Sequence, residues 1–109
     1  MTRRPVVAGM FYPFSRNSLE RMLSKLFENT EKGNFVCAVS PHAGYEYSGK
    51  TAAHAVNSLR PAKSFVILGP NHNMMGHEFS IMGSGKWETP MGRIEIDPEL
   101  AKELKGCDV

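Results

Sequence analysis

The chain begins with an extended stretch, "RPVVAGMFYPF", that is bracketed by Pro5 and Pro13, and then carries a strongly amphipathic segment. In "SRNSLERMLSKLF" the apolar positions follow the i, i+3, i+4, i+7, i+8 spacing of one helix face: Leu19, Met22, Leu23, Leu26 and Phe27. Ser15 or Asn17 can serve as the N-cap, and Gly33 in "EKGN" is the expected residue just beyond the last turn. This pattern predicts a helix.

Two continuous apolar runs follow, "FVCAVS" at 35–40 and "SFVILG" at 64–69, each stopped by a proline. Runs without alternation are typical of strands that are covered on both faces. The alanine-rich segment "SGKTAAHAVNSL" at 48–59 lies between them and predicts a helix capped by Ser48. The order strand, helix, strand predicts a parallel, right-handed βαβ unit at residues 35–69.

The last third of the chain has a different pattern. "EFSIMGSGKWETPMGRIEID" alternates and is interrupted by glycine and proline, so it predicts strand and hairpin. "DPELAKELKG" predicts a short helix, with Asp97 as N-cap, Pro98 at the first position and Gly106 just after the end. The expected fold class is therefore α/β, with a mostly parallel or mixed sheet and flanking helices.

Length and composition restrict the class further. The 109 residues allow a single domain over 1–109, and 41% hydrophobic and 22% charged residues are ordinary for a globular protein. A net charge of +2 with scattered basic residues disfavours nucleic acid as a partner. The apolar runs are far shorter than the roughly 20 residues of a membrane span, and no signal-peptide pattern begins the chain. Cys37 and Cys107 form no disulfide pattern, so we expect a reducing, cytoplasmic location.

Two histidines occupy matching positions behind the two apolar runs. His42 lies two residues beyond 35–40, and His72 lies three residues beyond 64–69. Because the carboxyl ends of parallel neighbouring strands share one edge of a sheet, both side chains could reach one point above it. Neutral imidazole is a common ligand of iron, copper and zinc, so the pair predicts a metal site. The alternative is that each is a loop histidine that contacts nearby backbone.

A second chemistry competes for the same region. "GYEYSGKT" matches G-x-x-x-x-G-K-[ST], follows a predicted strand and opens a predicted helix, as in a phosphate-binding loop. The nucleotide-binding candidates are Gly44, Gly49, Lys50 and Thr51. Tyr45 and Tyr47 are bulky for a loop that must wrap phosphate, and the run at 64–69 ends without an aspartate to support magnesium.

Three other residues are candidates for lining the predicted pocket. The hydroxyl of Tyr45 could point into it, or the ring could be buried at the start of the helix with its hydroxyl in water. Glu46 is a candidate third metal ligand, and Asn71 adjoins His72.

The motifs "RPVVAGMFYP", "SPHAGYEYSG" with "AAHA", "ILGPNHN" and "WETPMG", in this order from Arg4 to Asp97, resemble the Memo family. The resemblance implies an α/β fold similar to that of class III extradiol non-haem iron dioxygenases. It places His42 and His72 in the pocket that corresponds to the dioxygenase metal site. It does not require the Lys-Thr pair at 50 and 51, which weakens the nucleotide hypothesis.

Members of that family are more than twice as long as this chain, so the resemblance covers only an N-terminal portion of a larger domain. Such a portion would expose apolar surface, and we expect self-association or a partner chain that completes the fold. The resemblance implies a redox-metal site, with Fe(II) preferred and copper as the alternative. A non-enzymatic protein that holds a peptide or small ligand in the same pocket is the second hypothesis. The substrate, the reaction and the third ligand are left open.

Overall fold

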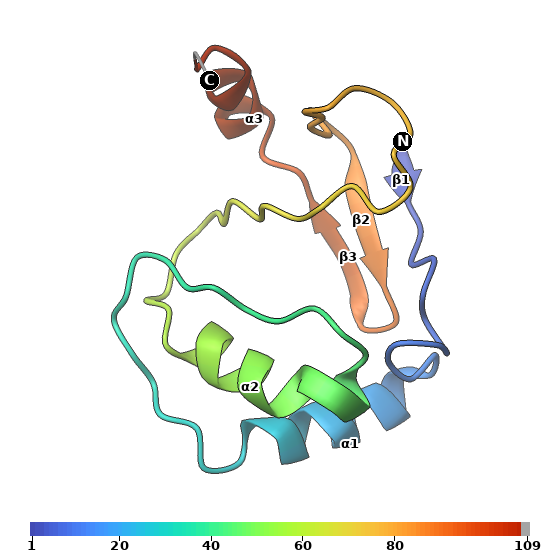
Figure 1. Cartoon of the computed structure of the whole chain (residues 1–109), viewed down its shortest axis with the longest axis vertical. Helices are drawn as coiled ribbons and strands as arrows, with labels where there is room; N and C mark the ends of the chain where they lie inside the picture. Colours follow the sequence, from blue (N-terminus) through green and yellow to red (C-terminus); the bar gives the residue numbers. More distant parts are fainter. Residues whose placement is uncertain (108–109) are drawn as a thin grey trace.

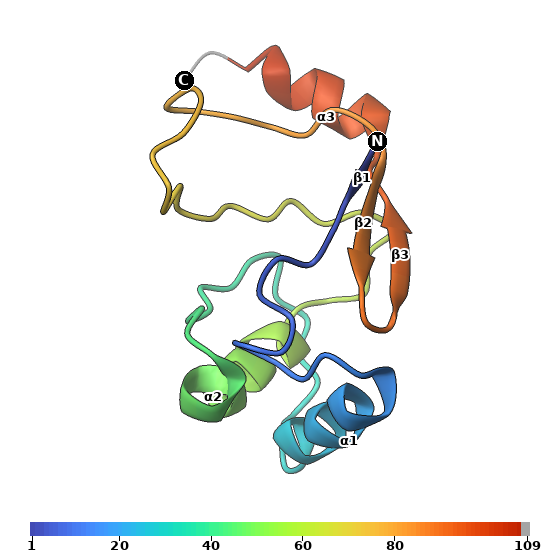
Figure 2. The same cartoon turned by 90° about the vertical axis from the view of Figure 1, so that its right-hand side faces the viewer.

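The computed structural model describes residues 1–107, and it contains three helices and one small sheet (Figure 1). The helices are α1 (Arg16–Phe27), α2 (Tyr45–Asn57) and α3 (Pro98–Lys105). The strands are β1 (Thr2–Arg3), β2 (Lys86–Thr89) and β3 (Gly92–Glu95), in the order β1-β2-β3. Helices α1 and α2 lie at one end, and the sheet and α3 lie at the other (Figure 2). The predicted α/β class with a mixed sheet is confirmed.

Helix α1 forms where the amphipathic pattern predicts it. The Ser15 side chain caps the helix by accepting a hydrogen bond from the Ser18 backbone N–H at 3.3 Å. The helix ends earlier than predicted, because Asn29 takes a positive φ of 59° just past the C-cap. Gly33 therefore does not end the helix. It lies instead where a Cβ would clash with the backbone of Ser58.

Helix α2 begins at Tyr45 with Gly44 as its N-cap, so it starts three residues before the predicted Ser48. It packs against α1, and Leu19 and Ala53 are two of the three buried apolar residues in the part of the chain that the structure describes. At Gly49 an added Cβ would lie 2.8 Å from Leu26 Cδ1. A side chain at position 49 would therefore force the Leu26 side chain to shift, whereas glycine lets the two helices pack without it.

The predicted hairpin is confirmed over residues 86–95, whereas residues 78–85 of the same stretch form no strand. Strand β1 pairs parallel to β2, and β2 pairs antiparallel to β3. Two cross-strand ion pairs follow the register, Lys86 with Glu95 at 3.1 Å and Arg93 with Glu88 at 3.0 Å. The guanidinium carbon of Arg3 lies 4.8 Å from the Trp87 ring centroid, which fixes the short parallel strand against the hairpin.

Helix α3 has the predicted start. The Asp97 carboxylate accepts a hydrogen bond from the Leu100 backbone N–H at 3.0 Å, and Pro98 is the first helical residue. Gly106 lies at the C-cap with φ −85°, so it does not take the left-handed position expected beyond the helix.

The predicted strands 35–40 and 64–69 are not formed, so the βαβ unit at 35–69 is present only as its helix. We call residues 35–40 and residues 64–69 the apolar segments. Within residues 1–107, their one sheet-like contact is an isolated parallel bridge between Phe35 and Leu59. Val39 is 98% exposed and Leu68 is 91% exposed. The prediction was wrong because a strand requires a neighbour for its backbone, and residues 1–107 provide none beside either segment.

None of the helices between residues 1 and 107 combines the length and the apolar character needed to cross a membrane.

Candidate functional site

The structure brings His42 and His72 together. Their Nε2 atoms are 3.2 Å apart, and their ring centroids are 5.3 Å apart at an interplanar angle of 45°. A hydrogen bond between the two Nε2 atoms requires a tautomer in which one of them carries a proton and the other is free to accept it. Residues 30 positions apart in sequence therefore meet at one point, as the sequence predicted, although the strands assumed in that prediction are not formed.

The spacing of the pair fits two ligands of one metal ion. Two imidazole nitrogens that each lie about 2.1 Å from a metal, at angles of about 90–110°, are separated by about 3.0–3.4 Å. The observed 3.2 Å falls in this interval. Both rings are solvent-exposed, so an ion can reach them. Among residues 1–107, no cluster of three or more histidine, cysteine, aspartate or glutamate side chains is suited to hold a metal.

The positions of the two histidines follow from local structure. His42 lies two residues before Gly44, the N-cap of α2, so the start of that helix fixes where the ring leaves the backbone. His72 lies in a turn in which the Asn71 side-chain amide donates to the Met75 carbonyl at 2.9 Å. Asn71 thus shapes the loop that presents His72.

Tyr45 and Glu46 face a different part of the molecule. The Tyr45 ring packs on Tyr12, with centroids 5.4 Å apart, and its backbone N–H donates to the Phe11 carbonyl at 2.8 Å. Burial, and secondarily the nearby Tyr12, raises the pKa of the Tyr45 phenol above its usual value. Both Tyr45 and Glu46 line an open groove over α1, together with residues such as Asn17. The groove does not include the histidine pair.

The stretch that matches a phosphate-binding loop is helical. After the N-cap Gly44, residues 45–51 belong to α2, so they do not form a loop around an anion. The Lys50 ammonium donates to the Leu26 carbonyl at 3.2 Å and also to the Glu28 carbonyl. It therefore binds the C-terminal end of α1, where the helix dipole favours a cation. Thr51 is exposed on α2.

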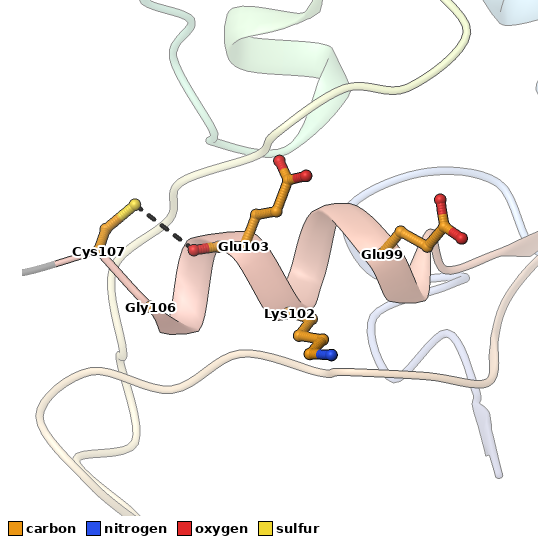
Figure 3. Close-up of a pocket in the computed structure, with 5 residues that line it drawn as sticks. All are labelled: Glu99, Lys102, Glu103, Gly106 and Cys107. Atoms are coloured by element: carbon orange, nitrogen blue, oxygen red, sulfur yellow. Dashed lines mark hydrogen bonds between the residues drawn. The ribbon is translucent and has the colours of Figure 1, made fainter.

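A second groove lies on α3, far along the chain from the histidines. It is lined by Glu99, Lys102, Glu103, Gly106 and Cys107 (Figure 3). The Cys107 thiol donates to the Glu103 carbonyl at 3.5 Å. Cys37 and Cys107 are both free and exposed, which agrees with the absence of a disulfide pattern in the sequence.

Sequence reasoning missed the contacts that join the two helices. Lys50 was a candidate for phosphate, and its contact with α1 became visible only once the helices were placed. A glycine inside a predicted helix, Gly49, was the available signal, because glycine in a helix interior costs stability and often marks close packing.

The fold and the site together define an α/β chain with a pair of exposed histidines that lie close enough to share one metal ion. A family model described as Memo-like protein matches residues 3–108. A MEMO1 family protein of Methanosarcina barkeri is 46% identical over 98% of this chain and 41% of its own length. Relatives from Caldivirga maquilingensis and Pyrococcus furiosus are 44% and 42% identical, and the matches cover 42% and 38% of their lengths.

The chain belongs to the Memo family, as the sequence motifs predicted. It spans about two fifths of the length of the curated relatives that it matches, so it represents part of the family domain.

Proposed function

We propose that His42 and His72 supply two ligands to a redox-metal site, with Fe(II) as the preferred ion and copper as the alternative. The 3.2 Å separation of the two Nε2 atoms is the observation that supports this most directly, because it falls within the range of spacings of two ligands on one ion. Family membership supports it as well, through the resemblance of the family pocket to that of the non-haem iron dioxygenases.

The roles of this chain's residues follow from their surroundings. The start of α2 orients His42, and the Asn71–Met75 hydrogen bond orients the loop of His72. In iron enzymes of this kind two histidines and one carboxylate hold the ion and leave positions open, where the metal can bring substrate and oxygen together. We expect the third ligand to come from outside residues 1–107.

An anaerobic Fe(II) titration tests the proposal. The chain should bind iron saturably, and His42→Ala and His72→Ala should each weaken binding by more than the roughly 10–100-fold typical of losing a group that only supports a ligand. His54→Ala is the matched control, because His54 is an exposed histidine on α2 outside the pair. A parallel Cu(I) titration identifies the preferred ion.

Absence of saturable binding of either metal would overturn the proposal for this chain. Equal losses in all three alanine variants would also contradict it, since they would show unspecific binding by surface imidazoles. Either result would favour the hypothesis of a non-enzymatic protein that binds a peptide or small ligand.

A further inference from the structure

Neither apolar segment, nor the proline that follows it, carries a charged side chain. Residues 35–41, "FVCAVSP", and 64–70, "SFVILGP", contain no acidic or basic residue in a chain that is 22% charged. Their exposed large hydrophobic side chains are Phe35, Val36, Val39, Phe65, Val66, Ile67 and Leu68. Several large apolar side chains left this exposed favour an interface, because covering them removes apolar area from water.

The backbone of the same segments is also unpaired. Around the first segment, the Phe35 N–H donates to the Ser58 carbonyl and the Phe35 carbonyl accepts from the Arg60 N–H. Beyond these bonds at Phe35, no backbone–backbone hydrogen bond of 35–40 or 64–69 is found within residues 1–107. An extended, apolar stretch with free N–H and C=O groups is a template for an added strand. Side chains and backbone therefore require the same kind of partner, a β-strand.

The pattern of the segments indicates how they are covered. Continuous apolar runs suit strands inside a sheet, which have a neighbour at each edge and cover on both faces. A second copy in a twofold arrangement would present the same patch to its mate. Each segment would then gain a neighbour at one edge only, and its other edge and outer face would stay in water.

The relatives show how much additional chain the family domain contains. The matches cover 38–42% of their lengths, so more than half of each relative has no counterpart in these 109 residues. That length is sufficient for several strands and helices. The three buried apolar residues of the described chain, Leu19, Ala53 and Ala101, are by contrast a very small core.

We propose that the apolar segments are the docking surface for the remaining portion of the family domain, supplied as polypeptide of the kind that the relatives carry beyond the matched region. On docking, residues 35–40 and 64–69 become strands of one sheet with strands of that portion, and its helices cover the faces. The proposal concerns an interface and does not require a metal.

The test is complementation in buffer that contains EDTA, so that metal binding plays no part. The chain is co-expressed with a tagged polypeptide comprising the part of the Methanosarcina barkeri relative that it does not match. We expect co-purification as a 1:1 complex by light scattering, and protection of amides 35–40 and 64–69 from hydrogen exchange.

Val39→Asp and Leu68→Asp are the test variants, because both side chains are almost fully exposed in the free chain and the substitutions leave its own packing intact. Each should weaken the complex at least about tenfold, equivalent to about 1.4 kcal/mol. Val39→Ile and Leu68→Met keep the positions apolar and should retain the complex.

Three results would overturn the proposal. One is failure of a folded wild-type chain to form the complex. Another is a complex that the aspartate variants bind as well as the wild type. The third is a stable homodimer that protects amides 35–40 and 64–69 and is not displaced by the added polypeptide, which would make a second copy the occupant.

Discussion

The α1–α2 pair and the apolar segments are both rich in apolar residues, and they differ in what those residues contact. In the helix pair Leu19 is 5% exposed, Gly49 lets the helices approach closely, and Lys50 joins the end of α1. In the apolar segments Leu68 is 91% exposed, and residues 64–69 have no neighbouring strand in the described part of the chain, residues 1–107.

The difference shows that an element forms only when two separate conditions are met: a suitable local sequence pattern and partners for its backbone and apolar side chains. An amphipathic helix satisfies its own backbone and needs only one neighbour for its apolar face. A buried strand needs neighbours for its backbone as well as its side chains. The helix pair finds its partners within about 40 residues, whereas the strands would need partners that residues 1–107 do not place beside them.

Truncating one leucine in each region gives the largest expected contrast. Leu19→Ala removes a buried side chain and should lower the free energy of unfolding by about 2–5 kcal/mol. Leu68→Ala, at an exposed position, should change it by no more than about 0.5 kcal/mol. Urea unfolding followed by circular dichroism measures both. Equal losses of unfolding free energy in the two variants would mean that residues 64–69 are packed in solution. The contrast drawn here between the helix pair and the apolar segments would then be wrong.

Removing the Lys50 ammonium tests the contribution of its hydrogen bonds between α2 and the C-terminal end of α1. Lys50→Met keeps the apolar stem but loses the hydrogen bonds to α1, and we expect a loss of about 0.5–1.5 kcal/mol, at the low end because the group is exposed. Lys32→Met, at an exposed loop position, is the control. Magnesium-ATP should not raise the melting temperature of the wild type. Protection by ATP that depends on Lys50 would revive the nucleotide hypothesis.

Acidification should produce the smallest change in stability. It acts at the contact between the second apolar segment and the start of α3. The Ser64 hydroxyl donates to the Asp97 carboxylate at 2.6 Å, and this bond, with the Leu100 N–H, lowers the pKa of Asp97. A lowered pKa means that the stabilisation is present above the usual carboxyl value of about 3.9 and is lost as the pH falls through the lowered value.

Asp97→Asn separates the charge from the cap, since asparagine also caps helices well. The variant should keep α3 and lose the acid-dependent part of its stability, as followed by amide exchange of α3 between pH 5 and about 2. An unchanged pH profile would show that the Asp97 carboxylate does not titrate with the helix.

The elements that the sequence predicted correctly carry their signals locally. Ser15 before the amphipathic run, the glycine and proline around β2 and β3, and Asp97-Pro98 before α3 each specify a start or a turn through contacts within a few residues. The predicted family membership rested on motifs spread over the whole chain, and the comparisons confirm it.

The remaining features depend on distant contacts. The sequence of 64–69 has strand character but cannot show whether a neighbour is present, and "SGKT" cannot show that Lys50 faces α1. The meeting of His42 and His72 was expected from two parallel strands that residues 1–107 do not form, and the stretches before and after α2 bring the two rings together without them. Metal binding by the pair stays a prediction.

Gly49 has a consequence for how such a site can change during evolution. Its lack of a side chain leaves room for Leu26 of α1, and α2 begins three residues after His42. We expect a larger residue at 49 to shift the helix and thereby alter the spacing of the two imidazoles. The spacing of the pair would then change through a helix contact, with both histidines unchanged.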